Sequence, residues 1–235
     1  IFAVIIGILC ARGLALRPHL ASYAMIPTFI YILAYREKFY FLLPLLTVVW
    51  VNLHGIEYVV GGLICGSYFL SRLINFSGDT KPLIWIALCL PTMMLNPNGL
   101  NVLLTPFILD PDLNRFISEM GHPKVEARLS LREGISTQTL VLILLGFVLA
   151  SGLLAVKQFQ THLAPILIAI GGLILLLMAG RFIWEWTLLS VPLVAVGLRY
   201  WHGPGYRLSG VAILTGMFFL LTVTYWPSLR HGLHH

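Results

Sequence analysis

Charged residues are scarce in this sequence. Asp, Glu, Lys and Arg make up 10% of the 235 residues, whereas hydrophobic residues make up 58%. An ordinary soluble domain is about 25% charged and about 45–50% apolar, so this chain has too few charges to cover a soluble fold of its size. The scarcity excludes a soluble enzyme, a disordered tail and a disulfide scaffold, and it favours a protein that crosses a membrane several times.

Cysteine is also scarce, and neither the cysteines nor the basic residues indicate a metal site or a nucleic-acid partner. Cys10, Cys65 and Cys89 each lie inside an apolar run, without the spacing of a disulfide framework or a zinc motif. The net charge is +6, but Lys and Arg stand singly between apolar runs and form no basic stripe. They are typical of residues that set membrane topology, so we expect no nucleic-acid partner.

The beginning of the chain lacks both an initiator Met and the basic segment of a signal peptide. An apolar run starts directly at Ile1, and no small-residue cleavage site follows it. Because a free amino terminus at the start of a membrane span would need solvation, we expect this chain to be a fragment of a longer protein with further helices upstream.

Nine long apolar runs are present, each close to the ~20 residues that span a bilayer as a helix. An open sheet edge cannot lie in lipid, so the runs predict an all-α polytopic membrane bundle of about eight or nine transmembrane helices with one long extracytoplasmic insert that shows no strand pattern. The predicted divisions are membrane helices 1–5 in residues 1–97, the insert in 98–137, helices 6–9 in 138–226 and a tail in 227–235. The runs are 1–16, 20–35, 39–53, 55–74, 82–97, 138–156, 162–180, 182–199 and 208–226.

Basic residues in the short loops predict which side of the bundle faces the cytoplasm. If successive spans alternate in direction, one side carries seven basic residues and the other carries three in its short connections, so the first side is predicted to be cytoplasmic. The seven are Arg36, Lys38, Arg72, Lys81, Lys157, Arg199 and Arg207, and the three are Arg17, Arg181 and Arg230.

The most informative polar residues flank a nearly loop-free turn that is predicted to face the non-cytoplasmic side. Trp50, Asn52, His54 and Glu57 lie there, where polar groups are costly unless they are paired or border water. His54 and Glu57 are three residues apart, and a carboxylate beside a histidine can hold the ring in one tautomer for base catalysis. We take these two as candidate catalytic residues and Trp50 and Asn52 as candidate substrate-binding residues. The alternative is an interhelical hydrogen bond and a helix cap.

A second polar motif on the same predicted side is Arg17-Pro18-His19. The guanidinium of Arg17 presents a fork of donors suited to a phosphate. We expect Arg17 and His19 to hold an anionic head group, with the alternative that Arg17 only reaches the interface by snorkelling.

Two further motifs supply candidate substrate-binding residues on that side. Asn96 and Asn98 belong to Asn-Pro-Asn-Gly, a pattern typical of a tight turn, which could also aim the insert across the site. Arg181 is a binding candidate as well, and its alternative is a structural pair with Glu185 one turn further along.

These motifs together resemble those of a known family. In chain order they are Arg17-Pro18, Trp50-x-Asn52-x-His54-Gly55, Asn96-Pro97-x-Gly99 and Ala179-x-Arg181. Their order and spacing resemble a bacterial family of polytopic membrane proteins similar to the glycosyltransferase-C superfamily, which includes dolichyl-phosphate-mannose-type protein mannosyltransferases. The resemblance runs from about residue 12 to residue 195.

The resemblance implies an enzyme of the bacterial inner (plasma) membrane that uses a polyprenyl-phosphate-linked sugar at the extracytoplasmic face. It implies that Arg17 and His19 contact the lipid phosphate and that Asn52, His54 and Glu57 line the sugar or acceptor pocket. No cofactor is assigned; a divalent metal ion stays open, without identified ligands. Expected partners are membrane lipid and, in a membrane complex, other proteins. The alternative is a non-catalytic membrane subunit that scaffolds or anchors a larger complex. It is motivated by the essential acid that such folds usually keep in a loop after their first helix, a region expected to lie upstream of Ile1.

Overall fold

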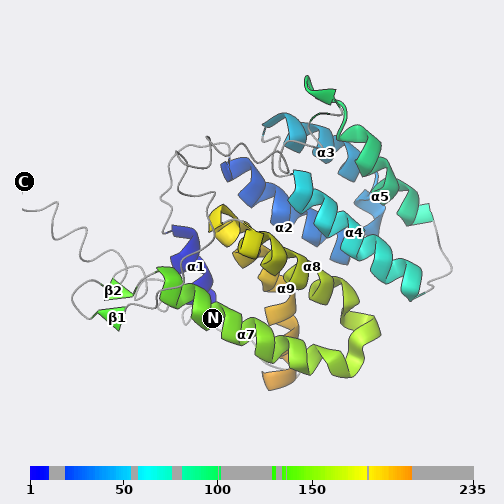
Figure 1. Ribbon diagram of the computed structural model, residues 1–235. Helices are drawn as coiled ribbons and strands as arrows, with labels where there is room; N and C mark the ends of the chain where they lie inside the picture. Colours follow the sequence, from blue (N-terminus) through cyan, green and yellow to red (C-terminus); the bar gives the residue numbers. More distant parts are fainter. Residues whose placement is uncertain are drawn as a thin grey trace, which may run out of the picture.

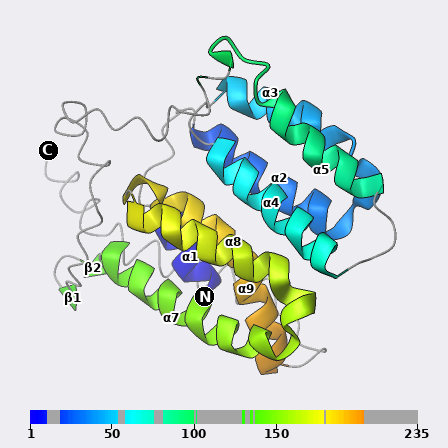
Figure 2. The ribbon, with the colours of Figure 1, turned by 45° about the vertical axis from the view of Figure 1, so that its right-hand side comes forward.

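The chain forms a bundle of helices, shown as a computed structural model in Figures 1 and 2. The structure describes residues 1–10, 19–53, 58–75, 81–99, 101, 129–130, 134–135, 137–178 and 180–202. Helices account for nearly all of these residues, which confirms the predicted all-helical class. The α-helices are α1 (Phe2–Cys10), α2 (His19–Tyr35), α3 (Leu42–Leu53), α4 (Tyr58–Ile74), α5 (Lys81–Thr92), α7 (Thr137–Ala155), α8 (Phe159–Met178) and α9 (Ile183–His202).

Short elements connect some of these helices. The 3-10 turns η1 (Glu37–Phe39), η5 (Val156–Gln158) and η6 (Gly180–Phe182) precede α3, α8 and α9. A small antiparallel ladder pairs β1 (Leu129–Ser130) with β2 (Gly134–Ile135) inside the insert, where the sequence predicts no strand. Strands of two residues are too short to show an alternating apolar pattern, so the prediction had no signal for them.

Two hydrophobic cores share the inner helices α8 and α9. The first core lies among α2, α3, α4 and α5 and includes Phe29, Trp50 and Ile64, with Ile168 and Leu189 reaching it from α8 and α9. The second lies among α1, α7, α8 and α9. Both ribbon views accordingly draw α8 and α9 between the α2–α5 group and the pair formed by α1 and α7 (Figures 1 and 2).

Contacts between helix ends show that three packed pairs of helices, α4 with α8, α8 with α9 and α9 with α1, run in opposite directions. The end of α4 meets the start of α8, where Asn75 Nδ2 donates to the carbonyl of Gln160 at 2.7 Å. The start of α8 meets the end of α9, where His162 Nε2 lies 3.2 Å from Tyr200 Oη. At the other end of the bundle, Trp184 Nε1 near the start of α9 donates to the carbonyl of Ile8 at 3.1 Å.

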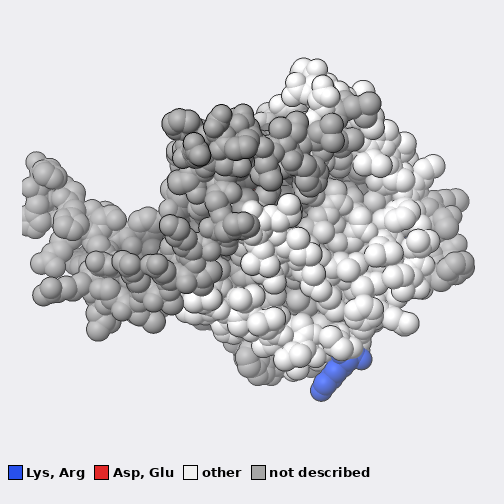
Figure 3. All heavy atoms as spheres, in the orientation of Figure 1, with Lys and Arg blue, Asp and Glu red and all other residues white. Residues whose placement is uncertain are grey.

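The described basic side chains gather at one end of the bundle, which we call the basic end. Arg72 at the end of α4 pairs with Glu37 in the turn after α2, and Lys157 occupies the turn that leads into α8. The face in Figure 3 is uncharged over its described surface except for a small basic spot at the lower edge, close to that turn. The basic end holds Arg36, Lys38, Arg72, Lys157 and Arg199.

Helix length limits how many elements can cross a bilayer alone. Among the described residues, one segment, Thr139–Met178, is long and apolar enough to cross a membrane. An 18-residue stretch of it has a mean hydropathy of 2.7, and the segment contains most of α7 and all of α8. Four other apolar helices have 10–17 residues. The 12-residue helices α3 and α5 extend only about 18 Å at ~1.5 Å per residue, short of the ~30 Å hydrocarbon layer. The predicted number of spans therefore stays a prediction.

Candidate functional site

Trp50, a predicted binding residue, lies in the first hydrophobic core. Its side chain is 2% exposed, and its ring packs at a centroid distance of 5.3 Å from Phe29. The indole Nε1 donates to Ser22 Oγ on α2 at 2.9 Å. A methyl group on Gly61 of α4 would come within 3.0 Å of Trp50 Cζ3. Trp50 therefore joins α2, α3 and α4 by packing, and its single donor is already used.

Asn52 lies at the end of α3 and is exposed. Its Nδ2 donates to the carbonyl of Val48 one turn earlier and to the carbonyl of Leu95 just after α5, both at 2.8 Å. These bonds tie the end of α3 to the turn after α5. Both bonds use the amide nitrogen of Asn52. Its amide oxygen takes part in neither, and it lies at the end of the bundle away from the basic residues.

Asn96 and Asn98 form a tight turn after α5. Asn96 Oδ1 accepts a hydrogen bond from the backbone N–H of Asn98 at 2.8 Å, and Asn96 Nδ2 donates to the carbonyl of Met93 at 2.7 Å. Gly99 has φ +52°, a left-handed conformation that glycine adopts without steric cost. The predicted turn chemistry of Asn-Pro-Asn-Gly is thus present, and it places Asn96 beside the carbonyl that Asn52 binds.

The other predicted site residues are only partly described. His19 is the first residue of α2 and Arg181 lies in η6, but the side chains of both are outside the described residues, as are Arg17, His54 and Glu57. Glu185, the predicted partner of Arg181, is buried in the first turn of α9. The structure therefore brings Trp50, Asn52 and Asn96 to one end of the α2–α5 group. Within its described part, it holds no cluster of three His, Cys, Asp or Glu residues that could bind a metal.

A groove of about 470 Å³ opens between α2 and α9, away from the predicted site. On each of these helices the lining positions recur every three or four residues, so each helix contributes one face. Tyr68 of α4 and Pro165 of α8 complete the lining. A volume of this size falls within the ~300–1,000 Å³ typical of ligand pockets. The lining residues from α2 and α9 are Ile26, Pro27, Ile30, Tyr31, Ala34, Tyr35, Leu188, Val191, Pro192, Ala195, Val196 and Arg199.

The groove changes character towards the basic end. Its deep part, near Ile26 and Leu188, is aliphatic, whereas Tyr35 and Arg199 lie at the ends of α2 and α9. Tyr31 Oη accepts a hydrogen bond from Arg36 Nε at 2.8 Å, and the Arg36 guanidinium lies 5.4 Å from the centre of the Tyr31 ring. The groove therefore has an apolar interior and a mouth lined by phenols and a guanidinium.

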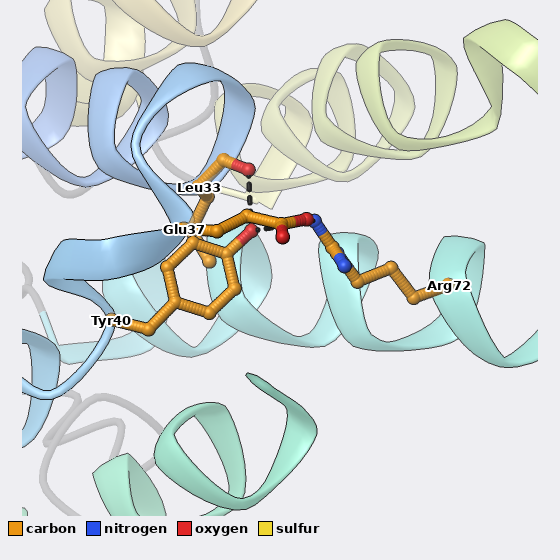
Figure 4. A network of polar contacts seen from close by, with 4 residues as sticks. All are labelled: Leu33, Glu37, Tyr40 and Arg72. Atoms are coloured by element: carbon orange, nitrogen blue, oxygen red, sulfur yellow. Dashed lines mark hydrogen bonds and ion pairs between the residues drawn. The ribbon is translucent and has the colours of Figure 1, made fainter. Parts of the chain in front are cut away.

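A polar network fixes the turn between α2 and α3 beside this mouth (Figure 4). Tyr40 Oη donates to the carbonyl of Leu33 at 2.6 Å and accepts a hydrogen bond from Arg72 at 3.0 Å. Arg72 also pairs with Glu37. Burial raises the pKa of Tyr40 above its ordinary value of 10.0, although the positive charge of Arg72 opposes this shift. The network links the end of α4 to the end of α2 and so supports the α2 wall of the groove.

Sequence reasoning missed the groove. The available signal was a stripe of apolar and small residues with Tyr or Arg at its basic end, in both α2 and α9. Each stripe by itself resembles an ordinary buried helix face, and only the tertiary fold shows that the two stripes face each other across open space. Comparison of the chain with protein-family models, with curated proteins and with solved structures finds no match.

Proposed function

We propose that this chain is an integral membrane protein, a polytopic helical bundle of the bacterial inner membrane. The observation that carries this proposal is the segregation of charge: Arg36, Arg72, Lys157 and Arg199 lie at one end of the bundle. In a membrane, basic residues collect at the cytoplasmic interface. A soluble helical bundle would instead distribute charge over its surface.

The composition of the exposed surface supports the same proposal. Leu153 is 76% exposed, and Leu90, Ile84 and Leu149 are each about 60% exposed. Single exposed leucines are ordinary in soluble proteins, but large apolar patches that water would contact are rare. Here the apolar residues extend along α5, α7 and α8 with hardly any described charge between them. Hydrocarbon chains are the solvent that suits such a surface.

Within this bundle, we propose a role like that of the glycosyltransferase-C superfamily, with a polyprenyl-phosphate-linked sugar bound at the end away from the basic residues. Arg17 and His19 bind the phosphate, and Asn52, His54 and Glu57 line the sugar or acceptor pocket. Support comes from the motif resemblance and from the location of Asn52 and Asn96 at that end, where Asn52 is exposed.

Lipid retention tests the phosphate site. The detergent-purified chain is incubated with a short-chain polyprenyl phosphate, and bound lipid is measured by native mass spectrometry. Arg17→Ala should reduce retention about ten- to a hundredfold, because a charge-assisted contact is worth ~1.5–3 kcal/mol. Lys157→Ala removes the same charge at the basic end and should leave retention unchanged. Full retention by Arg17→Ala would refute the site.

The sugar pocket is tested separately with His54→Ala. This variant should lose affinity for a polyprenyl-phosphate sugar but bind the sugar-free polyprenyl phosphate as the parent chain does. An equal loss of affinity for both lipids would show that His54 does not contact the sugar, because only a contact to the sugar discriminates the two ligands.

The second candidate is a non-catalytic membrane subunit that scaffolds or anchors a larger complex. The favouring observation is that Trp50 and Asn96 use their side-chain donors inside the chain, as helix and turn connections. Purification under mild detergent discriminates the two functions. Stoichiometric co-purification of another membrane protein, without any bound polyprenyl lipid, would favour the subunit.

A further inference from the structure

We propose that the groove between α2 and α9 binds one anionic glycerophospholipid, with an acyl chain along its apolar walls and the phosphate at Arg199. The inference shares the membrane location with the proposed function, but it concerns a different ligand at the opposite end of the bundle. It stands or falls independently of the polyprenyl-phosphate site.

The shape of the groove suits a hydrocarbon chain. On α9 the lining runs from Leu188 to Arg199, a length of roughly 16 Å along the helix axis. The walls are formed by aliphatic residues and by small or proline residues, among them Pro192 and Ala195. Apart from the tyrosines Tyr31, Tyr35 and Tyr68, these side chains offer no hydrogen-bond donor. The aliphatic part of the groove therefore selects an apolar ligand, and each buried methylene group adds favourable transfer free energy.

The charge at the mouth selects an anionic head group. Arg199 is exposed on the last turns of α9 and lines the groove. The carboxylates that the structure describes are Glu37 and Glu185. Glu37 pairs with Arg72, and Glu185 lies in the first turn of α9, near the far end of that helix. Within the described part of the chain, therefore, no carboxylate neutralises the charge of Arg199, and a lipid phosphate can do so.

The depth of these groups in the proposed membrane also matches a phospholipid. Tyr31 and Tyr35 are about half exposed and two-thirds exposed at the end of α2, and their rings lie 5.8 Å apart. Tyrosines of this kind are enriched at the level of lipid head groups. Arg36 is held against Tyr31 and adds a second positive charge at the same level. On the cytoplasmic side of a membrane, anionic lipids supply the counter-charge, worth ~1 kcal/mol per basic residue.

Native mass spectrometry tests the head-group contact. The full chain is reconstituted in phosphatidylcholine vesicles that contain phosphatidylglycerol, extracted in mild detergent and weighed with its retained lipid. We expect one phosphatidylglycerol to remain preferentially bound. Arg199→Ala should lower its retention about five- to tenfold, the equivalent of losing one partly exposed phosphate contact. Lys157→Ala, which removes a positive charge from the same end outside the groove, should retain phosphatidylglycerol as the parent chain does. Equal loss in both variants would indicate a general surface charge effect and overturn the proposal.

A steric test keeps the charge in place. Ala195→Trp fills the groove and should displace phosphatidylglycerol even though Arg199 is intact. Ala87 on α5 is exposed but does not line the groove, so Ala87→Trp is the matched control and should retain the lipid. Retention by Ala195→Trp would show that the lipid binds elsewhere.

Photo-cross-linking identifies the occupant directly. A photoreactive amino acid at Ala195 should form an adduct of phospholipid mass when the protein is irradiated in these vesicles. An adduct within the chain to the apolar run 208–226, or an adduct to another protein, would show that polypeptide fills the groove and would overturn the proposal.

The outcomes separate this inference from the proposed function. Loss of phosphatidylglycerol in Arg199→Ala, with unchanged polyprenyl-phosphate retention, supports the groove site whatever the fate of the sugar-lipid site. Unchanged phosphatidylglycerol in Arg199→Ala, with lost polyprenyl phosphate in Arg17→Ala, refutes the groove site alone.

Discussion

Trp50 and Trp186 are both buried in the bundle, but their indole N–H groups are treated differently. Trp50 is 2% exposed and Trp186 is fully buried. Trp50 Nε1 donates to Ser22 Oγ, whereas Trp186 Nε1 has no hydrogen-bond partner among the described residues. A buried donor without a partner costs free energy. Removing the N–H group therefore lowers the free energy of unfolding at Trp50, where a hydrogen bond is lost, but not at Trp186. Comparing the two residues therefore distinguishes the contribution of the hydrogen bond from that of ring packing.

Phenylalanine at each position tests this difference. Both substitutions remove ring volume, but only Trp50→Phe also removes a hydrogen bond. We therefore expect Trp50→Phe to reduce the free energy of unfolding by about 1 kcal/mol more than Trp186→Phe. Thermal unfolding followed in detergent micelles measures the difference. A larger loss in Trp186→Phe would show that ring packing, and not the bond to Ser22, dominates at these sites.

Tyr40 is the residue whose ionisation affects stability in the loop between α2 and α3. Its folded pKa is raised above the ordinary value of 10.0, first by burial. The folded chain therefore keeps a proton at alkaline pH that the unfolded chain releases. This contribution to stability is complete below pH 10.0 and is lost as the pH rises through the folded pKa.

The variant Tyr40→Phe removes this titration. At neutral pH it should lower the unfolding free energy by about 1 kcal/mol, because the hydrogen bond to the Leu33 carbonyl is lost. Above pH 10.0, the parent chain should lose stability more steeply than the variant. Unfolding temperatures from neutral to strongly alkaline pH measure both effects. Parallel curves for the two proteins would contradict an ionisation role for Tyr40.

At the scale of whole helices, glycine contacts set how closely neighbouring helices approach. A methyl group on Gly197 of α9 would lie 2.1 Å from Ser151 Oγ and 2.9 Å from Ser151 Cα on α7. The backbone of α7 is therefore in the way, and it cannot rotate aside as a long side chain can. Gly146 on α7 has no atom within 4 Å of the corresponding position.

Alanine at these two glycines should have opposite effects. Gly197→Ala forces α7 and α9 apart and should cost about 1–3 kcal/mol of unfolding free energy, as overpacking does. Gly146→Ala meets no neighbour and should be neutral or stabilising by up to about 1 kcal/mol, because alanine favours the helix. Unfolding in detergent compares both variants with the parent. Equal effects would mean that the α7–α9 approach is looser than described.

The positions of the helices could largely be predicted from the sequence, but their ends could not. Apolar runs depend on local composition, and each run up to residue 199 contains a helix. The run starting at residue 39 becomes helical only at Leu42, because the Glu37–Phe39 turn and the Tyr40 network come first. The run ending at residue 97 leaves the helix at Thr92, because Asn96 bonds the backbone of its own turn. Individual side-chain hydrogen bonds determine such helix ends, and the spacing of apolar residues does not reveal these bonds.

For the molecule as a whole, the sequence predicts which side of the bundle each polar residue faces. It does not predict which of these residues form hydrogen bonds within the chain. Asn96 was expected in a turn, and it is there. Trp50 was a candidate binding residue, with an interhelical hydrogen bond as the alternative for its turn, and its donor bonds Ser22 on a neighbouring helix. The groove depends on the approach of α2 to α9, which are far apart in the chain, so no local pattern could reveal it.

Membrane orientation is the prediction that tests the whole arrangement. Lys157 in the turn before α8 and Asn98 in the turn after α5 are both exposed. The end of α4 meets the start of α8 and the residues just before α3, whereas the end of α3 meets the turn after α5, so Lys157 and Asn98 lie at opposite ends of the bundle. Cysteine introduced as Lys157→Cys should react with an impermeant maleimide only from the cytoplasmic side, in inverted vesicles. Cysteine introduced as Asn98→Cys should react only in intact spheroplasts, because basic residues stay on the cytoplasmic side. The background chain for both variants, and the control, carries Cys10→Ser, so that its remaining cysteines are the buried Cys65 and Cys89. Labelling of both positions from one side would contradict the alternating topology, and labelling with the sides exchanged would contradict the orientation alone.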